Sequence, residues 1–190
     1  VLAAGFIQVA IQGNNPYFSG FQGHELPNML MWAAVSGIVC GVAGGLFGSF
    51  LYRGAAAFAP VRWRSFIRRH LLVVAFAMGI LLALLGTFYQ GKTYGTGYHE
   101  AAAALKGAYE APIGLAAAKW AATVFSYWAG IPGGIFTPSL TIGAMIGEHM
   151  ASFAQLGDAS NVAVLLCMAA FLAAATQSPL TAAVVVMEMT

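Results

Sequence analysis

The residues with the clearest chemical potential form a glycine- and proline-rich run at positions 130–138. Gly133 and Gly134 let a backbone approach a ligand closely and adopt angles that other residues avoid. Pro138 suits the first turn of a helix, where amide N–H groups have no intrahelical partner. Such N–H groups, at the positive end of the helix dipole, can hold an anion without a charged side chain and still release it. The run therefore predicts an anion channel or transporter, and a plain loop before a membrane helix is the alternative.

Three further groups could act on a ligand or a proton. Ser178 is a suitable N-cap and Pro179 a suitable first helical residue, which favours a simple helix start. Glu188 lies in the apolar run that follows; an ionisable residue inside a membrane helix suggests function, and a position near the interface is the alternative. His149 beside Glu148 could exchange a proton, but a polar pair at a helix end is the preferred interpretation. We find no zinc-protease spacing, phosphate loop or Ser-His-Asp set, so we expect neither an enzyme nor a metal site.

The composition excludes an ordinary soluble domain. Of the 190 residues, 60% are hydrophobic and only 7% are charged, against roughly 25% charged in globular proteins. Disordered chains are poor in apolar residues, so disorder is excluded as well. A membrane protein remains, with the lipid bilayer as its surroundings, since about 20 apolar residues form one spanning helix. The net charge of +2 and the two cysteines predict no nucleic-acid partner, no disulfide and no cofactor.

The first half of the chain contains two charge-free windows. Residues 28–52 and 71–91 are each long enough to span a bilayer. Residues 1–12 read as the tail of a helix that begins upstream, followed by a loop to position 26, and the Gly-rich stretch 90–100 reads as an external loop. A basic cluster separates the two windows and predicts a cytoplasmic loop; it comprises Arg53, Arg62, Arg64, Arg68 and Arg69.

The second half contains shorter, interrupted apolar segments. We expect a short helix at 101–107, an apolar segment at 111–127 broken only by Lys119, an interruption at 131–134 and a helix at 138–154. A turn at Asp158 follows, and residues 159–187 divide into two helices at 178–179, because proline disfavours helix in the residue before it. Apolar residues come in blocks rather than in alternation, which indicates an all-α fold. Discontinuous membrane helices are typical of transport sites.

Small residues four apart predict close helix packing. The pairs are Gly37 with Gly41, Gly44 with Gly48, and Gly143 with Gly147. The four tryptophans are expected to include anchors at the membrane interface; they are Trp32, Trp63, Trp120 and Trp128. Because the chain stops in an apolar run, we expect it to be a piece of a longer membrane protein.

The sequence around the candidate site resembles that of a known protein family. The run Gly134-Ile135-Phe136-Thr137-Pro138 matches the GxFxP motif of the CLC family of chloride channels and chloride/proton antiporters. The SPLT sequence at 178–181 and the MEMT sequence at 187–190 are similar to the later APLT…EMT helix of that family. The YGTGY sequence at 94–98 resembles its external segment before a short helix. The resemblance covers essentially the whole chain, in the same order.

The resemblance implies an all-α, polytopic protein of the cell (inner) membrane with tilted and discontinuous helices. CLC proteins are homodimers, each subunit has its own anion pathway, and each is built from two inverted halves. Residues 1–190 would be part of one CLC transmembrane domain, most of the second half, and residues 1–12 and 179–190 would lie at the dimer interface. The amides of Ile135 and Phe136 would contact the central chloride, the transported ligand, within an anion-binding set of Gly134, Ile135, Phe136, Thr137 and Pro138.

The family's remaining functional residues are not in this chain. Its gating glutamate, proton-transfer glutamate, central serine and central tyrosine fall elsewhere, so the sequence leaves channel or antiporter, and the preferred anion, undecided. A neutral-solute channel or a cation-coupled secondary transporter also uses broken helices and is the main alternative. A cation site would favour acidic residues at the midplane, and the apolar windows offer only Glu188 and Lys119. An intramembrane enzyme has no catalytic pair to support it.

Overall fold

The computed structural model describes residues 10–11, 13, 18, 26, 28–58, 64–65, 67, 69–107, 111–131 and 133–189. Several sequence expectations lie wholly or mainly outside these residues, namely the helix tail at 1–12, the loop up to 26, Arg62, Trp63, Arg68 and Pro132. In the described part the chain forms helices and no strand. The all-α prediction is therefore confirmed.

Each expected apolar segment between residues 28 and 189 corresponds to a helix. The helices are α2 (Met29–Phe58), α4 (Leu71–Phe88), α5 (Tyr98–Leu105), α6 (Leu115–Trp128), α7 (Phe136–Phe153), the short 3-10 helix η1 (Gly157–Ala159), α8 (Ser160–Thr176) and α9 (Pro179–Met189). The predicted division at 178–179 is confirmed: Gln177 ends α8 with a left-handed φ of 56°, and Pro179 begins α9. Helix α7 starts at Phe136, two residues before the predicted start at Pro138.

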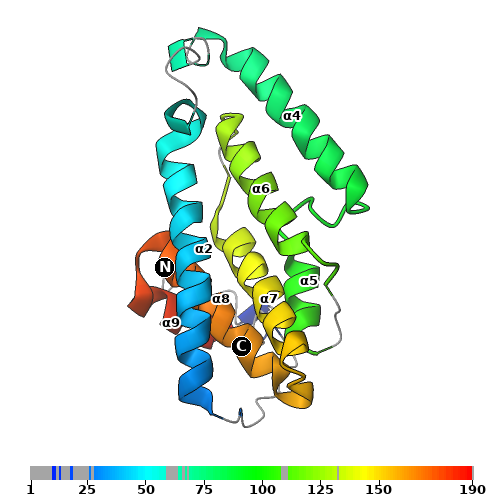
Figure 1. The fold of residues 1–190 in the computed structure, drawn as a ribbon, viewed down its shortest axis with the longest axis vertical. Coiled ribbons are helices and arrows are strands. Elements are labelled where there is room, and N and C mark those ends of the chain that lie inside the picture. Colours follow the sequence, from blue (N-terminus) through cyan, green and yellow to red (C-terminus); the bar gives the residue numbers. More distant parts are fainter. Residues whose placement is uncertain are drawn as a thin grey trace.

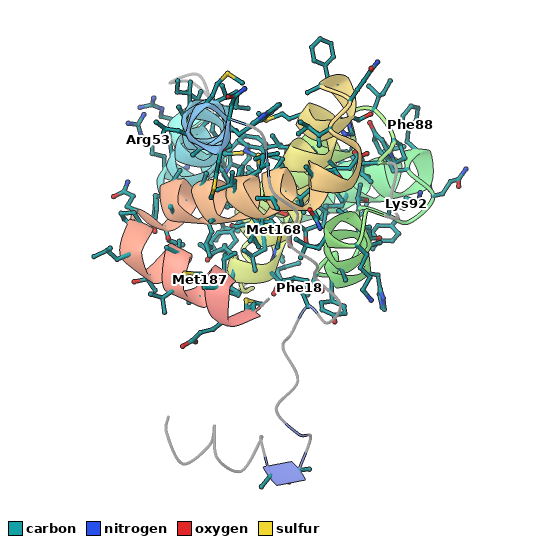
Figure 2. The ribbon with its side chains drawn as sticks, turned by 90° about the horizontal axis from the view of Figure 1, so that it is seen from below. Phe18, Arg53, Phe88, Lys92, Met168 and Met187 are labelled. Carbon is teal, nitrogen blue, oxygen red and sulfur yellow. The ribbon has the colours of Figure 1, made fainter. Side chains whose placement is uncertain are left out.

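Helix α8 is the centre of the packing. It contacts α2, α5, α7 and α9, and Figure 2 shows it crossing the middle of the molecule with Met168 near its centre. Met168 and Phe171 are both fully buried. Helix α2 runs along one side of the molecule, whereas α4 leans away from it (Figure 1). The core is thus built around a short apolar helix, as the block pattern of the sequence predicts.

Close glycine contacts hold α8 to its two main neighbours. A Cβ placed on Gly143 would lie 2.7 Å from Cys167 O, and one on Gly147 would lie 2.7 Å from Val164 Cα. A Cβ on Gly44 would lie 2.7 Å from Phe171 O. The packing role predicted for the pairs 143/147 and 44/48 is therefore confirmed, because side chains at these positions would force the helices apart.

The pair of Gly37 and Gly41 makes no such close contact. A Cβ on either Gly37 or Gly41 meets no atom within 4 Å. This pair packs against nothing in the described part of the chain, so its predicted packing role is not fulfilled there. The reason is geometric: both glycines lie on α2, and its contact with α8 runs through Gly44 and Gly48 instead.

Two of the tryptophans predicted as candidate interfacial anchors join helices. Trp128 Nε1 donates a hydrogen bond to Phe50 O at 2.9 Å, and Trp120 Nε1 donates to Ala43 O at 3.3 Å. Both acceptors lie on α2 and both donors lie on α6. The indole N–H groups therefore find partners inside the helix bundle, where a buried ring otherwise leaves its donor unsatisfied.

Two helices are long and apolar enough to cross a bilayer, over Met29–Gly54 and Leu71–Phe88. Only 22% and 6% of their apolar windows are buried. Leu30 and Leu72 are 87% and 86% exposed, which is costly in water but favourable in lipid. Three residues of the basic cluster are exposed: Arg53 near the end of α2, and Arg64 and Arg69 between the two helices.

Candidate functional site

The site is built where the chain reverses between α6 and α7. Helix α6 rises to about the height of the upper end of α2 in Figure 1, and the chain then returns to mid-height before α7 begins. Gly130 makes this reversal possible, because its φ of 80° is left-handed and favours glycine. Its N–H donates to Tyr127 O at 3.0 Å. The predicted interruption of the apolar stretch is therefore a reversal of the chain that places the start of α7 at mid-height of the molecule (Figure 1).

Gly133 and Gly134 serve a different purpose from the predicted one. Neither has a left-handed φ, so a left-handed backbone is not what glycine provides at these two positions; in this run it is found at Gly130, for which it was not predicted. Both glycines are exposed, and a Cβ on either would meet no atom within 4 Å. Their contribution is open space beside the backbone, which allows a ligand to approach closely.

The first turn of α7 presents free amide groups. Ile135 is the N-cap of the helix, and its side chain accepts no hydrogen bond from the first turn. The first intrahelical bond runs from Ser139 N to Ile135 O at 3.0 Å. Phe136 and Thr137 precede that bond, so their N–H groups have no intrahelical acceptor, and Pro138 carries no N–H. The helix therefore begins with uncapped donors at the positive end of its dipole.

A pocket of about 340 Å³ opens beside this helix start. It lies between α4, α6, the segment 93–95 and the residues that lead into α7. No charged side chain lines it among the residues that the structure describes. The lining residues are Leu82, Thr93, Tyr94, Gly95, Ala122, Thr123, Ser126, Tyr127, Ile131, Gly133, Gly134 and Pro138. Of the five predicted site residues, Gly134 and Pro138 line the pocket directly, and the other three adjoin them in the chain.

One wall of the pocket was missed by the sequence analysis. Residues 90–100 are predicted to form an external loop, and the structure shows that part of this segment is buried: Thr93 is only 5% exposed and packs beside α6. Lys119, itself 1% exposed, lies in α6 and donates to Thr93 O at 2.9 Å, Tyr94 O at 2.9 Å and Gly95 O at 2.8 Å. The only sequence signal was a lone lysine in an apolar segment.

The remaining candidate residues lie away from the pocket. Glu188 is exposed on α9. His149 Nδ1 lies 2.8 Å from Glu148 Oε2 near the C-terminal end of α7, as preferred for a polar pair at a helix end. Ser178 O accepts the first helical bond of α9, from Ala182 N at 3.0 Å, in agreement with a simple helix start. None of these residues lines the pocket at the start of α7.

Comparisons with known proteins show which sequences this chain resembles. The sequence model of the family described as "Voltage gated chloride channel" matches residues 1–190. The H(+)/Cl(-) exchange transporter ClcA of Yersinia pestis bv. Antiqua (strain Angola) is 29% identical over 172 residues, which cover 86% of this chain and 35% of that protein. The protein of the same name from Citrobacter koseri is 29% identical over 170 residues, with the same coverage.

This chain therefore spans 35% of the length of these curated relatives. No solved structure matches it. The family match extends over the whole chain and includes the helix start at Phe136 and the pocket beside it. The chain belongs to the voltage-gated chloride channel family.

Proposed function

We propose that the protein carrying this chain transports chloride or a related anion across a membrane, as a channel or as a chloride/proton antiporter. One observation carries the proposal. Helix α7 begins with uncapped amides beside an open pocket whose described lining holds no charged side chain. Family membership supports the same function, and the two relatives described above are named as exchangers of H+ and Cl−.

The amides of Ile135 and Phe136 would hold the anion, with Gly134, Thr137 and Pro138 shaping the site. Gly134 keeps the approach open because no side chain stands beside the backbone. Pro138 sets the helical φ of the first turn without adding an N–H. Neutral peptide dipoles attract an anion less strongly than a desolvated ammonium group in contact with it would. The bound anion can therefore leave again, which conduction requires.

The setting of the site is also part of the proposal. We infer a multi-pass protein of the cell (inner) membrane in which this chain forms most of the second half of a CLC-type inverted repeat. The exposed apolar surfaces of α2 and α4 support contact with lipid. We further propose a homodimer with α9 at its interface, because Leu180 and Met187 on that helix are 84% and 76% exposed. Transport of this kind involves no covalent chemistry, so we propose neither an enzyme activity nor a cofactor.

Chloride efflux from liposomes that contain the full-length protein tests the function, with external pH recorded at the same time. Chloride movement coupled to proton uptake would identify an antiporter, and chloride movement without protons would identify a channel. Transport of a neutral solute or a cation in place of chloride would contradict the proposal. No described residue favours that alternative, because no carboxylate lines the pocket.

A further inference from the structure

Lys119 uses all of its hydrogen-bonding capacity on one wall of the pocket. An ammonium group has three donors, and here they go to three consecutive carbonyl oxygens, those of residues 93, 94 and 95. Among the described residues no carboxylate forms an ion pair with it. A buried lysine therefore has peptide carbonyls as its partners, and these carbonyls belong to residues that line the pocket.

This arrangement fixes where the negative ends of three peptide dipoles point. Each carbonyl oxygen lies within hydrogen-bonding distance of the ammonium group, so it is occupied there and does not face a ligand in the pocket. A carbonyl oxygen that turned into the pocket would repel an anion. The lysine thus keeps three carbonyl oxygens, each of which would repel an anion, from facing the pocket. It also adds a positive charge behind the pocket wall.

The same segment is tied to α7 by its next residues. Thr141 Oγ1 lies 3.0 Å from Thr96 O, and a Cβ on Gly97 would lie 2.4 Å from Thr141 Cγ2. The φ of Gly97 is 80°, so glycine is required there for its backbone angle as well. Segment 93–97 is therefore held between α6 and α7, and its position relative to the α7 amides is defined from both sides.

Thr93 provides a second, independent observation. Its side chain is 5% exposed and its Oγ1 atom has no hydrogen-bond partner among the described residues. Buried hydroxyl groups are almost always bonded, and one without a partner needs an explanation. Thr93 lines the pocket, but its Oγ1 atom has almost no accessible surface. The hydroxyl therefore reaches a ligand in the pocket only when the side chain rotates about χ1, and it then has a proton to donate.

We propose that Lys119 is a positioning residue for anion binding, which turns the carbonyls of residues 93–95 away from the pocket and leaves the Thr93 hydroxyl free to rotate toward the anion as a further donor. The inference rests on the proposed function of the pocket. It adds two residues outside the α7 helix start to the machinery that recognises the anion. It also explains why a charged residue is retained in an otherwise apolar helix.

Chloride affinity of the full-length protein, measured by calorimetry in detergent, tests the inference. Lys119→Met keeps the length of the side chain and removes its charge and donors, so chloride affinity should fall about tenfold or more. Lys119→Arg should restore most of the affinity, because the guanidinium group keeps the charge and donates to several carbonyls. Thr93→Val should weaken chloride binding without lowering the melting temperature, since it removes a hydroxyl that has no protein partner.

The matched control is Val124→Ala, which alters a buried residue of α6 that does not line the pocket. This variant should lower the melting temperature and leave chloride affinity unchanged. Unchanged affinity in Lys119→Met, or an equal loss in Val124→Ala, would overturn the positioning role. Unchanged affinity in Thr93→Val would overturn the hydroxyl contact, and this variant decides the question if Lys119→Met does not fold. Absence of chloride binding in the unmodified protein would instead contradict the proposed function.

Discussion

Gly134 is the residue at which the proposed site can be blocked most directly. Replacing Gly134 with leucine should reduce chloride flux about tenfold or more, because the added side chain displaces the anion from the α7 amides. The protein should still fold, because a Cβ at this position meets no atom within 4 Å. Chloride efflux from liposomes measures the change. Gly45→Leu is the control: it has the same open surroundings but lies on α2, away from the pocket.

Equal flux in Gly134→Leu and in the unmodified protein would show that the anion does not pass this helix start. Loss of flux in the Gly45→Leu control as well would point to a general effect of added bulk. The comparison is informative because both glycines have open surroundings, whereas only Gly134 lies beside the pocket.

Residue-scale prediction from the sequence succeeded only where function is encoded locally. The helix start at Phe136 and the proline of its first turn follow from a short motif, since backbone geometry needs these residue types in this order. Lys119 and Thr93 could not be assigned. Their contact joins positions 26 apart, and the acceptor is a backbone carbonyl, which every residue carries. The sequence contains no complementary side chain that could indicate the pairing.

At the scale of elements, the contact between α7 and α8 depends on glycines. Gly143→Ala places a Cβ 2.7 Å from Cys167 O and 2.8 Å from Met168 Cα, and both are backbone atoms that cannot rotate away. Helix α8 must shift, so stability should fall by about 1–3 kcal/mol. Thermal unfolding of the purified full-length protein measures the loss. Gly45→Ala serves as the control and should not destabilise, because its surroundings are open and alanine favours helix.

The two tryptophans that join α6 to α2 should differ in their contribution. Trp128→Phe keeps an aromatic ring but removes a 2.9 Å hydrogen bond to Phe50 O, at a cost of about 0.5–1.5 kcal/mol. Trp120→Phe removes a longer bond of 3.3 Å to Ala43 O, so the cost of that lost bond should be smaller. Melting temperatures of the two variants give the order. The opposite order would show that ring packing, not hydrogen bonding, decides the stability of this contact.

Helices and loops could be predicted where the sequence signal lies within a few residues of the feature that it determines. Proline at 179 predicted the division between α8 and α9, because its effect on the preceding residue is covalent. The role of the tryptophans was not predictable, since an amphipathic ring suits a membrane interface and a helix contact equally well. Polar, Gly-rich composition suggested an external loop at 90–100. Thr93 is buried, and its carbonyl oxygen accepts a hydrogen bond from Lys119 in α6. The composition of residues 90–100 alone cannot indicate a partner that lies outside that segment.

At the scale of the whole molecule, the described helices leave much apolar surface uncovered. Helix α4 packs against α6 and against no other described helix, and only 6% of its apolar window is buried. Phe76, Leu84 and Phe88 on this helix are 72%, 60% and 80% exposed. Lipid can cover part of this surface. The glycine pair Gly37 and Gly41 on α2 is an additional open face of the kind that membrane helices use to pack together.

We therefore expect residues 1–190, expressed without further sequence, to be heterogeneous or aggregated in detergent and unable to transport chloride. Faces such as that of Gly37 and Gly41 would pair non-specifically when nothing covers them, and the proposed pathway would be lined on one side alone. Size-exclusion chromatography and liposome efflux measure the two properties, with the full-length protein as the positive control. A monodisperse, chloride-conducting product of these residues would contradict the prediction. It would mean that α7 and the segment held by Lys119 enclose a complete anion pathway.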